Sequence, residues 1–131
     1  MRARQRIGRA LRKLPRPARP TQATFTGGTA HAYACLLRKK NVKARRLENL
    51  PIRRPELVRL ILRLLPLSAR EIAKLPGMPA DRVTVALPAF LVLDEVIHRL
   101  NLSRIRVSTH GLRYGIWLAH LAKAPVRKIV R

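Results

Sequence analysis

Two glycines and a threonine stand between a strand-like run and an apolar helical stripe near the start of the chain. Gly27, Gly28 and Thr29 follow the run that ends at Thr26, and the stripe begins directly after them. Glycines let the backbone approach a ligand closely, and the first turn of a helix attracts anions through its free amides and its dipole. The pattern predicts phosphate binding at these three residues. The alternative is an ordinary tight turn in which the threonine caps the helix.

Basic side chains form a second group of candidates for binding. Five of them lie at the end of the predicted helix or shortly after it: Lys39, Lys40, Lys43, Arg45 and Arg46. The whole chain of 131 residues has 29 Lys and Arg against 6 Asp and Glu, which gives a formal net charge of +23. Such an excess favours a polyanionic partner, and polyphosphate, RNA and acidic membrane surfaces all qualify. The alternative for the cluster is a solvated basic loop.

Residues that could perform catalysis are scarce. Phosphoryl transfer needs a carboxylate or a metal ion to position water, and cations to stabilise the transition state. Only the cations are abundant, and Asp94 and Glu95 fall inside a predicted helix, where we expect them to face solvent or Arg99. We therefore assign no catalytic residue.

Metal ligation and thiol chemistry are also not predicted. Four histidines occur without the spacing of metal ligands: His31, His98, His110 and His120. The single cysteine, Cys35, lies in an apolar helical stripe, where we expect a buried structural thiol with no histidine base beside it. No metal site and no cofactor can be identified from these residues.

The hydrophobic pattern places the candidates on a helix-rich α/β frame. Alternating residues predict strands at 23–26 and 103–108, helical periodicity predicts helices at 29–40, 55–65, 68–75 and 80–100, and a turn with a last helix follows at 111–123. Ser68 and Glu71 form a capping box for the short helix, and Pro88 predicts a kink or break in the longest one. The side chains expected on the inward faces are Ala30, Tyr33, Ala34 and Leu37; Leu57, Leu60, Ile61 and Leu64; and Val83, Leu87, Phe90, Leu91, Ile97 and Leu100.

Aromatic residues are few. The candidates for stacking on bases are Phe25, Tyr33, Phe90, Tyr114 and Trp117, and most of them fall at predicted core positions. We therefore expect no base stacking, so any contact with RNA would be mainly to phosphates.

A longer stretch, residues 67–118, links these patterns to a known family. It contains Leu75-Pro76-Gly77-Met78 and Arg82-Val83-Thr84, and it ends with Val107-Ser108 and Gly111-Leu112-Arg113-Tyr114-Gly115. With Gly27-Gly28-Thr29-Ala30-His31, these motifs resemble the GGTAR, LPGL/RAD and VS..GLREG motifs of the exopolyphosphatase and guanosine pentaphosphate phosphohydrolase (Ppx/GppA) family. The resemblance covers about Ile7 to Leu118. Four positions depart from the family pattern: His31, Thr84, Pro88 and Tyr114.

The resemblance implies a fold and a site. The fold is part of an actin-like, ribonuclease-H-like ATPase domain, namely the carboxyl-terminal part of the family's second domain. His31 and Arg113 join the phosphate-binding candidates if the first and last motifs converge. In the family, two phosphate loops and a catalytic acid precede the GGTAR turn, so we expect a module without complete hydrolytic machinery, and enzymatic activity stays uncertain. Family members typically use a divalent metal such as magnesium.

These observations predict a truncated Ppx/GppA-like module that binds phosphate polymers, either polyphosphate or guanosine polyphosphate. The alternative is a basic RNA-binding component of a ribonucleoprotein, and a third interpretation is a decayed copy of the enzyme. Polyphosphate is the first partner expected and RNA the second, with a homodimer or a complementing chain as protein partners.

Three segments are predicted: a basic helical arm with a proline-rich connector at 1–20, the family-like domain at 21–122, and a basic tail at 123–131. No apolar run reaches the roughly 20 residues of a spanning helix, so no transmembrane segment is expected. The compartment predicted is the cytoplasm. The arginine-rich start leaves a mitochondrial presequence as the alternative.

Overall fold

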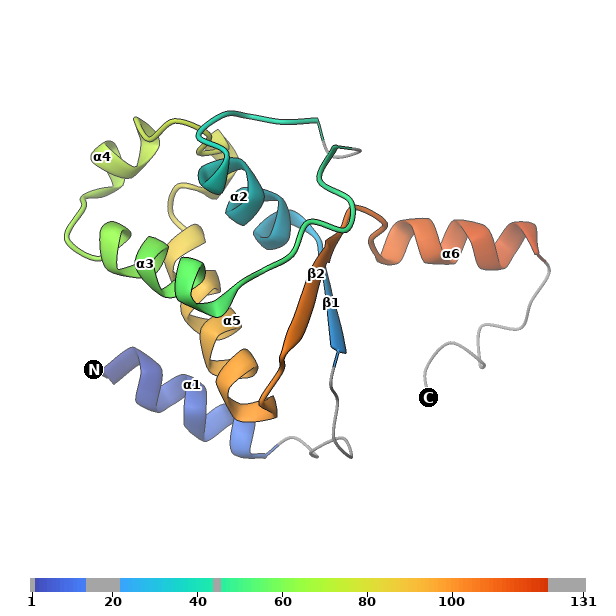
Figure 1. The fold of residues 1–131 in the computed structure, drawn as a ribbon, viewed down its shortest axis with the longest axis horizontal. Coiled ribbons are helices and arrows are strands. Elements are labelled where there is room, and N and C mark those ends of the chain that lie inside the picture. The colour runs from blue at the N-terminus through green and yellow to red at the C-terminus, as the bar shows by residue number, and fades with distance from the viewer. Residues whose placement is uncertain (1, 14–21, 44–45, 123–131) are drawn as a thin grey trace.

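Two short parallel strands form the only sheet in the described part of the chain, and helices pack on one of its faces (Figure 1). The computed structural model describes residues 2–13, 22–43 and 46–122. The order of elements is α1 (Arg2–Arg12), β1 (Gln22–Thr26), α2 (Gly28–Leu37), α3 (Arg54–Leu64), α4 (Ala69–Ala73), the 3-10 helix η2 (Ala80–Arg82), α5 (Ala86–Leu100), β2 (Arg104–Ser108) and α6 (Leu112–Leu121). The helix-rich α/β prediction is confirmed. The tail at 123–131 and Arg45 lie outside the described residues, as does most of the proline-rich connector.

The register of the sheet explains its alternating sequence. β1 and β2 pair in parallel with Ala23 opposite Ile105 and Phe25 opposite Val107, so these four apolar side chains share the face that meets the helices. The segment after residue 48 covers the other edge of β2, where the amide of Val107 donates to the Leu50 carbonyl over 2.8 Å. Because the two strands are parallel, their C-terminal ends lie side by side, next to the start of α2.

α2 is buried on most of its circumference. Ala30, Tyr33 and Ala34 are buried as predicted, whereas Leu37 is 39% exposed and the prediction for it is wrong. Leu36 is buried in its place. A single apolar stripe predicts the buried residues only for a helix that has one face in solvent. α2 contacts β1, β2, η2 and α5, so it is buried on several sides.

α3 and α4 follow their sequence signals closely. Leu57, Leu60, Ile61 and Leu64 are all buried. At α4 the Ser68 hydroxyl accepts from the Glu71 amide and the Glu71 carboxylate accepts from the Ser68 amide, which completes the predicted capping box.

A glycine fixes the connection after α4 against the end of α2. Gly77 has φ of 89°, and a Cβ there would collide with the Cys35 carbonyl and crowd the Lys40 amide. Because these neighbours are backbone atoms, the turn accepts only glycine at this close approach.

The predicted helix at 80–100 is broken before Pro88 rather than at it. η2 ends at Arg82, and α5 begins at Ala86. Pro88 lies in the first turn of α5, where its missing N–H has no helical partner to lose, so it causes no kink. Phe90 and Ile97 are buried, and Val83, Leu87, Leu91 and Leu100 pack partly buried against the core.

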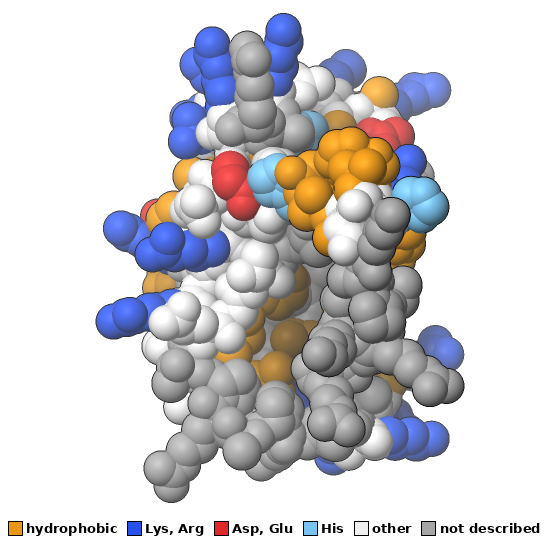
Figure 2. Space-filling view, turned by 90° about the vertical axis from the view of Figure 1, so that its right-hand side faces the viewer, with side chains coloured by type: hydrophobic (Ala, Val, Ile, Leu, Met, Phe, Trp, Pro, Cys, Tyr) orange, Lys and Arg blue, Asp and Glu red, His pale blue; other side chains and the backbone are white. Residues whose placement is uncertain are grey.

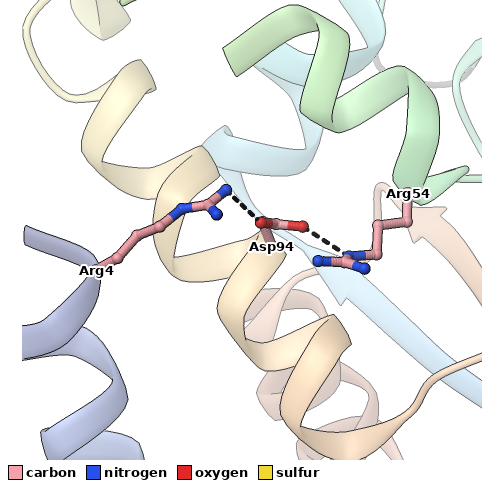
Figure 3. A network of polar contacts seen from close by, with 3 residues as sticks. All are labelled: Arg4, Arg54 and Asp94. Atoms are coloured by element: carbon pink, nitrogen blue, oxygen red, sulfur yellow. Dashed lines mark hydrogen bonds and ion pairs between the residues drawn. The ribbon is translucent and has the colours of Figure 1, made fainter. Parts of the chain in front are cut away.

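Asp94 corrects the sequence interpretation most clearly. It is 1% exposed and lies between two arginines: Arg4 of α1 at 2.7 Å and Arg54 of α3 at 2.8 Å (Figure 3). Neither solvent nor Arg99 is its partner, because its side chain lies between α1 and α3, which both pack against α5. One carboxylate thus joins three helices and pairs with two cations, so the group of three side chains keeps one net positive charge.

Candidate functional site

A cleft of about 1000 Å³ lies where both strands end and where α2 and α6 begin. The cleft is lined by Gly27, Gly28, His31, Asn41, Pro79, Ala80, Asp81, Arg82, Val107, Ser108, Thr109, Gly111, Leu112, Arg113 and Tyr114. The first and last motifs of the sequence therefore do converge. Of the five predicted phosphate-binding residues, the structure brings Gly27, Gly28, His31 and Arg113 to this cleft, whereas Thr29 is not among its lining residues.

The glycine turn leaves the start of α2 without a side-chain cap. Gly27 is the N-cap residue with φ of 93°, a conformation that favours glycine, and no side chain accepts from the first-turn amides. Thr29 lies inside the helix, so the interpretation of this threonine as the cap is wrong. The amides of the first turn and the helix dipole are thus directed toward the cleft without competition from a capping oxygen.

Arg82 is a site residue that the sequence analysis missed. Its guanidinium lies so close to Gly28 that a Cβ at that glycine would collide with it. Its Nε is 3.0 Å from Asp81, whose side chain is 69% exposed, so the pair is open to exchange with a competing anion. The signal was present in the sequence, since Arg82 is part of a family-like motif, but only the folded chain brings η2 against the glycine turn.

His31 faces the cleft with one nitrogen already engaged. Its Nε2 lies 3.0 Å from the Val42 carbonyl oxygen and 3.5 Å from Cys35 Sγ. The expectation that no histidine lies beside Cys35 is therefore wrong. A hydrogen bond to a carbonyl requires the proton on Nε2, so this nitrogen is not a base for the thiol. Cys35 is fully buried as expected, and its Sγ accepts from the Val42 amide over 3.5 Å.

The predicted cationic cluster does not form one site with the glycine turn. Lys39 and Lys40 are exposed just after the C-terminal end of α2, whereas the cleft lies at its N-terminal end. Lys43 and Arg46 are exposed on the segment that follows. These cations enlarge the positive surface around α2 rather than line the cleft.

A carboxylate anchors the loop that joins β2 to α6. Glu48 Oε2 accepts from both the amide and the hydroxyl of Thr109 at 2.6 Å, and it lies 3.4 Å from His110 Nδ1. These bonds, first of all the one from the Thr109 hydroxyl, lower the pKa of Glu48 to about 2. Thr109 lines the cleft, so Glu48 supports this wall from behind.

The cleft does not suit a divalent metal ion with the residues described. Magnesium prefers several oxygen ligands, and the cleft offers one carboxylate, Asp81, which is already paired with Arg82. Within residues 2–13, 22–43 and 46–122, no group of three His, Cys, Asp or Glu side chains lies together as a metal site would require. In the same ranges no helix is long and apolar enough to cross a membrane.

Comparison with known proteins identifies related chains. Residues 1–124 match the family model described as the Ppx/GppA phosphatase family. No curated protein sequence matches at a significant level. Among solved structures, the Aquifex aeolicus member of the Ppx/GppA family is similar with a TM-score of 0.84 and 17% identity, over 93% of this chain and 40% of that one.

A second solved structure is also similar. An exopolyphosphatase from Cytophaga hutchinsonii has a TM-score of 0.73 and 22% identity, over 94% of this chain and 43% of its own. The chain thus spans about two fifths of the length of these relatives. At such identities the likeness shows the fold, which is part of an actin-like ATPase fold.

Proposed function

Because the chain belongs to the Ppx/GppA phosphatase family, we propose that it is a phosphatase-like module that binds phosphate polymers, polyphosphate first and guanosine polyphosphate second, in the cleft at Gly27 and Gly28. The observation that carries the proposal is the convergence of an uncapped helix N-terminus with Arg82 and Arg113 around one cleft. Amides of the first turn of α2 would donate to phosphate oxygens, and the two guanidinium groups would neutralise them.

The proposal includes binding and no hydrolytic step. Asp81, the one carboxylate among the described residues that line the cleft, is an exposed partner of Arg82. A phosphate polymer is longer than the cleft residues can cover. The exposed cations after α2, including Lys39, Lys40 and Lys43, would therefore add to its binding affinity by counterion release. The cytoplasmic location and the division of the chain into three segments stay predictions.

A charged chain binds any polyanion to some degree, so the test must separate the cleft from the general positive field. Affinity for inorganic polyphosphate is measured by calorimetry at one fixed salt concentration, for the wild type, Arg82→Gln and Arg113→Gln. Arg59→Gln is the matched control, because Arg59 is an exposed arginine on α3 that does not line this cleft. We expect each cleft variant to lower affinity about tenfold and the control to change it less than about threefold.

Gly28→Val provides an independent test of the turn. A side chain there displaces Arg82 from its position over the helix N-terminus, so affinity should fall as it does for Arg82→Gln. A circular dichroism melt checks that this variant folds. If Gly28→Val and Arg82→Gln bind normally while removal of Lys39, Lys40 and Lys43 abolishes binding, the glycine turn is not the site. Tighter binding of structured RNA than of polyphosphate at equal phosphate concentration would favour the RNA alternative.

A further inference from the structure

Four apolar side chains form an uncovered stripe along α6. They are Tyr114, Trp117, Leu118 and Leu121, which follow one another at intervals of three, one and three residues and therefore share one side of the helix. Their exposed fractions run from 42% for Tyr114 to 58% for Leu121, and the ring centroids of Tyr114 and Trp117 are 6.0 Å apart. The expectation that Tyr114 and Trp117 occupy core positions is therefore wrong.

The stripe is not the side by which α6 meets the rest of the described chain. Ala119 is the one residue that α6 buries, and it lies on a different side of the helix. In Figure 2 hydrophobic side chains gather on the face that α6 presents, with histidines next to them. A contiguous apolar patch on a protein surface marks a site of interaction.

The outer face of β2 presents arginines on the same side of the sheet. Ile105 and Val107 face the helices, so Arg104 and Arg106 alternate onto the opposite face, and both are exposed. Figure 1 shows α6 on that side of the sheet, away from α3 and α5. The apolar stripe and these two cations therefore belong to one side of the molecule.

The sequence around α6 adds positive charge and no negative charge. No Asp or Glu follows Glu95, and Arg113 lies on α6 itself. The carboxylate of Glu48 is near the start of α6, but it already accepts from Thr109 and lies 3.4 Å from His110 Nδ1. The nine residues after α6 and Ala122 contain Lys123, Arg127, Lys128 and Arg131. A partner of this surface must therefore offer both an apolar layer and negative charge.

An anionic lipid surface has both properties. Leucine and tryptophan side chains of an interfacial helix enter the boundary between headgroups and acyl chains, where Trp and Tyr are enriched, and basic residues attract anionic lipids. RNA would pair with the cations but would leave the leucines in water. A second copy would bring the same positive charge. One face of a helix of 10 residues, about 15 Å long, is also small against the roughly 800 Å² that each partner buries in a stable dimer.

We propose that α6 and the outer face of β2 bind a membrane surface rich in anionic phospholipids. Trp117, Leu118 and Leu121 enter the headgroup region, and α6 lies in the plane of the interface. Arg104 and Arg106 lie against lipid phosphates. The surface is separate from the phosphate cleft in its apolar part, because Trp117, Leu118 and Leu121 do not line that cleft.

Vesicle binding of the full chain provides the test. Vesicles of phosphatidylcholine alone are compared with vesicles of equal parts phosphatidylcholine and phosphatidylserine, and flotation at one fixed salt concentration measures the bound fraction. We expect binding to the mixed vesicles to be at least about tenfold tighter. The emission of Trp117, the single tryptophan, should shift to shorter wavelength with the mixed vesicles. It should not shift with inorganic polyphosphate, because only lipid removes the indole from water.

A pair of leucine variants separates the stripe from apolar surface in general. Leu118→Ser/Leu121→Ser removes side chains that are 44% and 58% exposed, and the control Leu62→Ser/Leu65→Ser removes side chains that are 61% and 53% exposed at α3, on the other side of the sheet. We expect the α6 variant to weaken vesicle binding at least about tenfold and the control less than about threefold. The affinity of the α6 variant for inorganic polyphosphate should stay unchanged.

A pair of arginine variants separates the outer face of β2 from the general positive field. Arg104→Gln/Arg106→Gln should weaken binding to the mixed vesicles by about fivefold for each arginine. The control is Arg59→Gln/Arg63→Gln, which removes the same charge from exposed positions on α3. It should weaken binding less than about threefold in total.

Several results would overturn the proposal. Equal losses in the two leucine variants, or vesicle binding without a shift of Trp117 emission, would mean that α6 does not enter the lipid. A dimer seen by analytical ultracentrifugation without lipid, and abolished by Leu118→Ser/Leu121→Ser, would show that a second copy covers the stripe. Structured RNA that shifts Trp117 emission as far as the vesicles do would assign the surface to RNA. Loss of polyphosphate binding in Arg82→Gln with vesicle binding intact would support both proposals as separate sites.

Discussion

α5 and α6 are both rich in apolar residues, yet one is buried and the other stands free. α5 buries Ala86, Phe90, Leu93 and Ile97, together with Asp94. α6 buries Ala119 alone, and six of its large side chains are more than 40% exposed. The two helices show that apolar composition selects candidates for burial, whereas the neighbours decide which of them are covered.

The difference follows from where each helix lies along the chain. α5 lies between α1, α2 and α3 and contacts all three (Figure 1). α6 follows β2 and extends beyond the end of the sheet, so in the described part of the chain little packs against it. Apolar residues occur on most sides of α6, and Arg113 and His120 share its one polar side, a pattern that favours contact with a ligand or another surface.

The largest contrast is expected between Phe90 and Trp117. Phe90→Ala leaves a cavity in the core beside Tyr33, whose ring centroid is 6.3 Å away, and should lower the free energy of unfolding by about 3–5 kcal/mol. Trp117→Ala should change it by less than about 1 kcal/mol, because the indole is more than half exposed. Urea unfolding measures both. Equal losses would show that α6 is packed in solution and would break the comparison.

A second contrast concerns the polar contact that fastens α5. Asp94→Ala should cost about 2–3 kcal/mol, because two charge-assisted hydrogen bonds are lost, while Arg4 and Arg54 remain half exposed and are hydrated. Arg4→Ala alone should cost about 1 kcal/mol or less, since Arg54 still pairs with the carboxylate.

The double variant Arg4→Ala/Arg54→Ala tests whether either arginine can replace the other as the partner of Asp94. It leaves a buried carboxylate without a partner, so the loss in free energy of unfolding should exceed the sum of the losses in the two single variants. A double-mutant cycle by urea unfolding gives the coupling energy. Simple additivity would mean that the two arginines stabilise Asp94 independently of each other.

The smallest effect is expected at Glu48, which fastens the base of α6. Its pKa is lowered to about 2 from an ordinary value of 4.5, so its contribution to stability is complete above pH 4.5 and is lost as the pH falls toward 2. Thermal melts should show a modest fall in Tm over this range. Glu48→Gln should remove that part of the pH dependence, and an unchanged pH profile in this variant would count against the contact with Thr109.

Local signals in the sequence determined several features correctly. The stripe of α3 and the capping box of α4 depend on residues three or four positions apart, which meet whenever a helix forms. The glycine turn between β1 and α2, the two strands and the family are likewise readable from short patterns. These features need no knowledge of distant neighbours.

The tertiary structure alone decided which charged and aromatic residues are covered. Asp94 is buried because α1 and α3 both pack against α5 and each sends an arginine to its side chain, and Arg82 reaches the glycine turn because η2 packs on α2. Tyr114 and Trp117 are exposed because α6 extends beyond the sheet. Periodicity records which side chains share a face, but the energy of burying that face depends on contacts between segments far apart in the sequence, and no local pattern contains them.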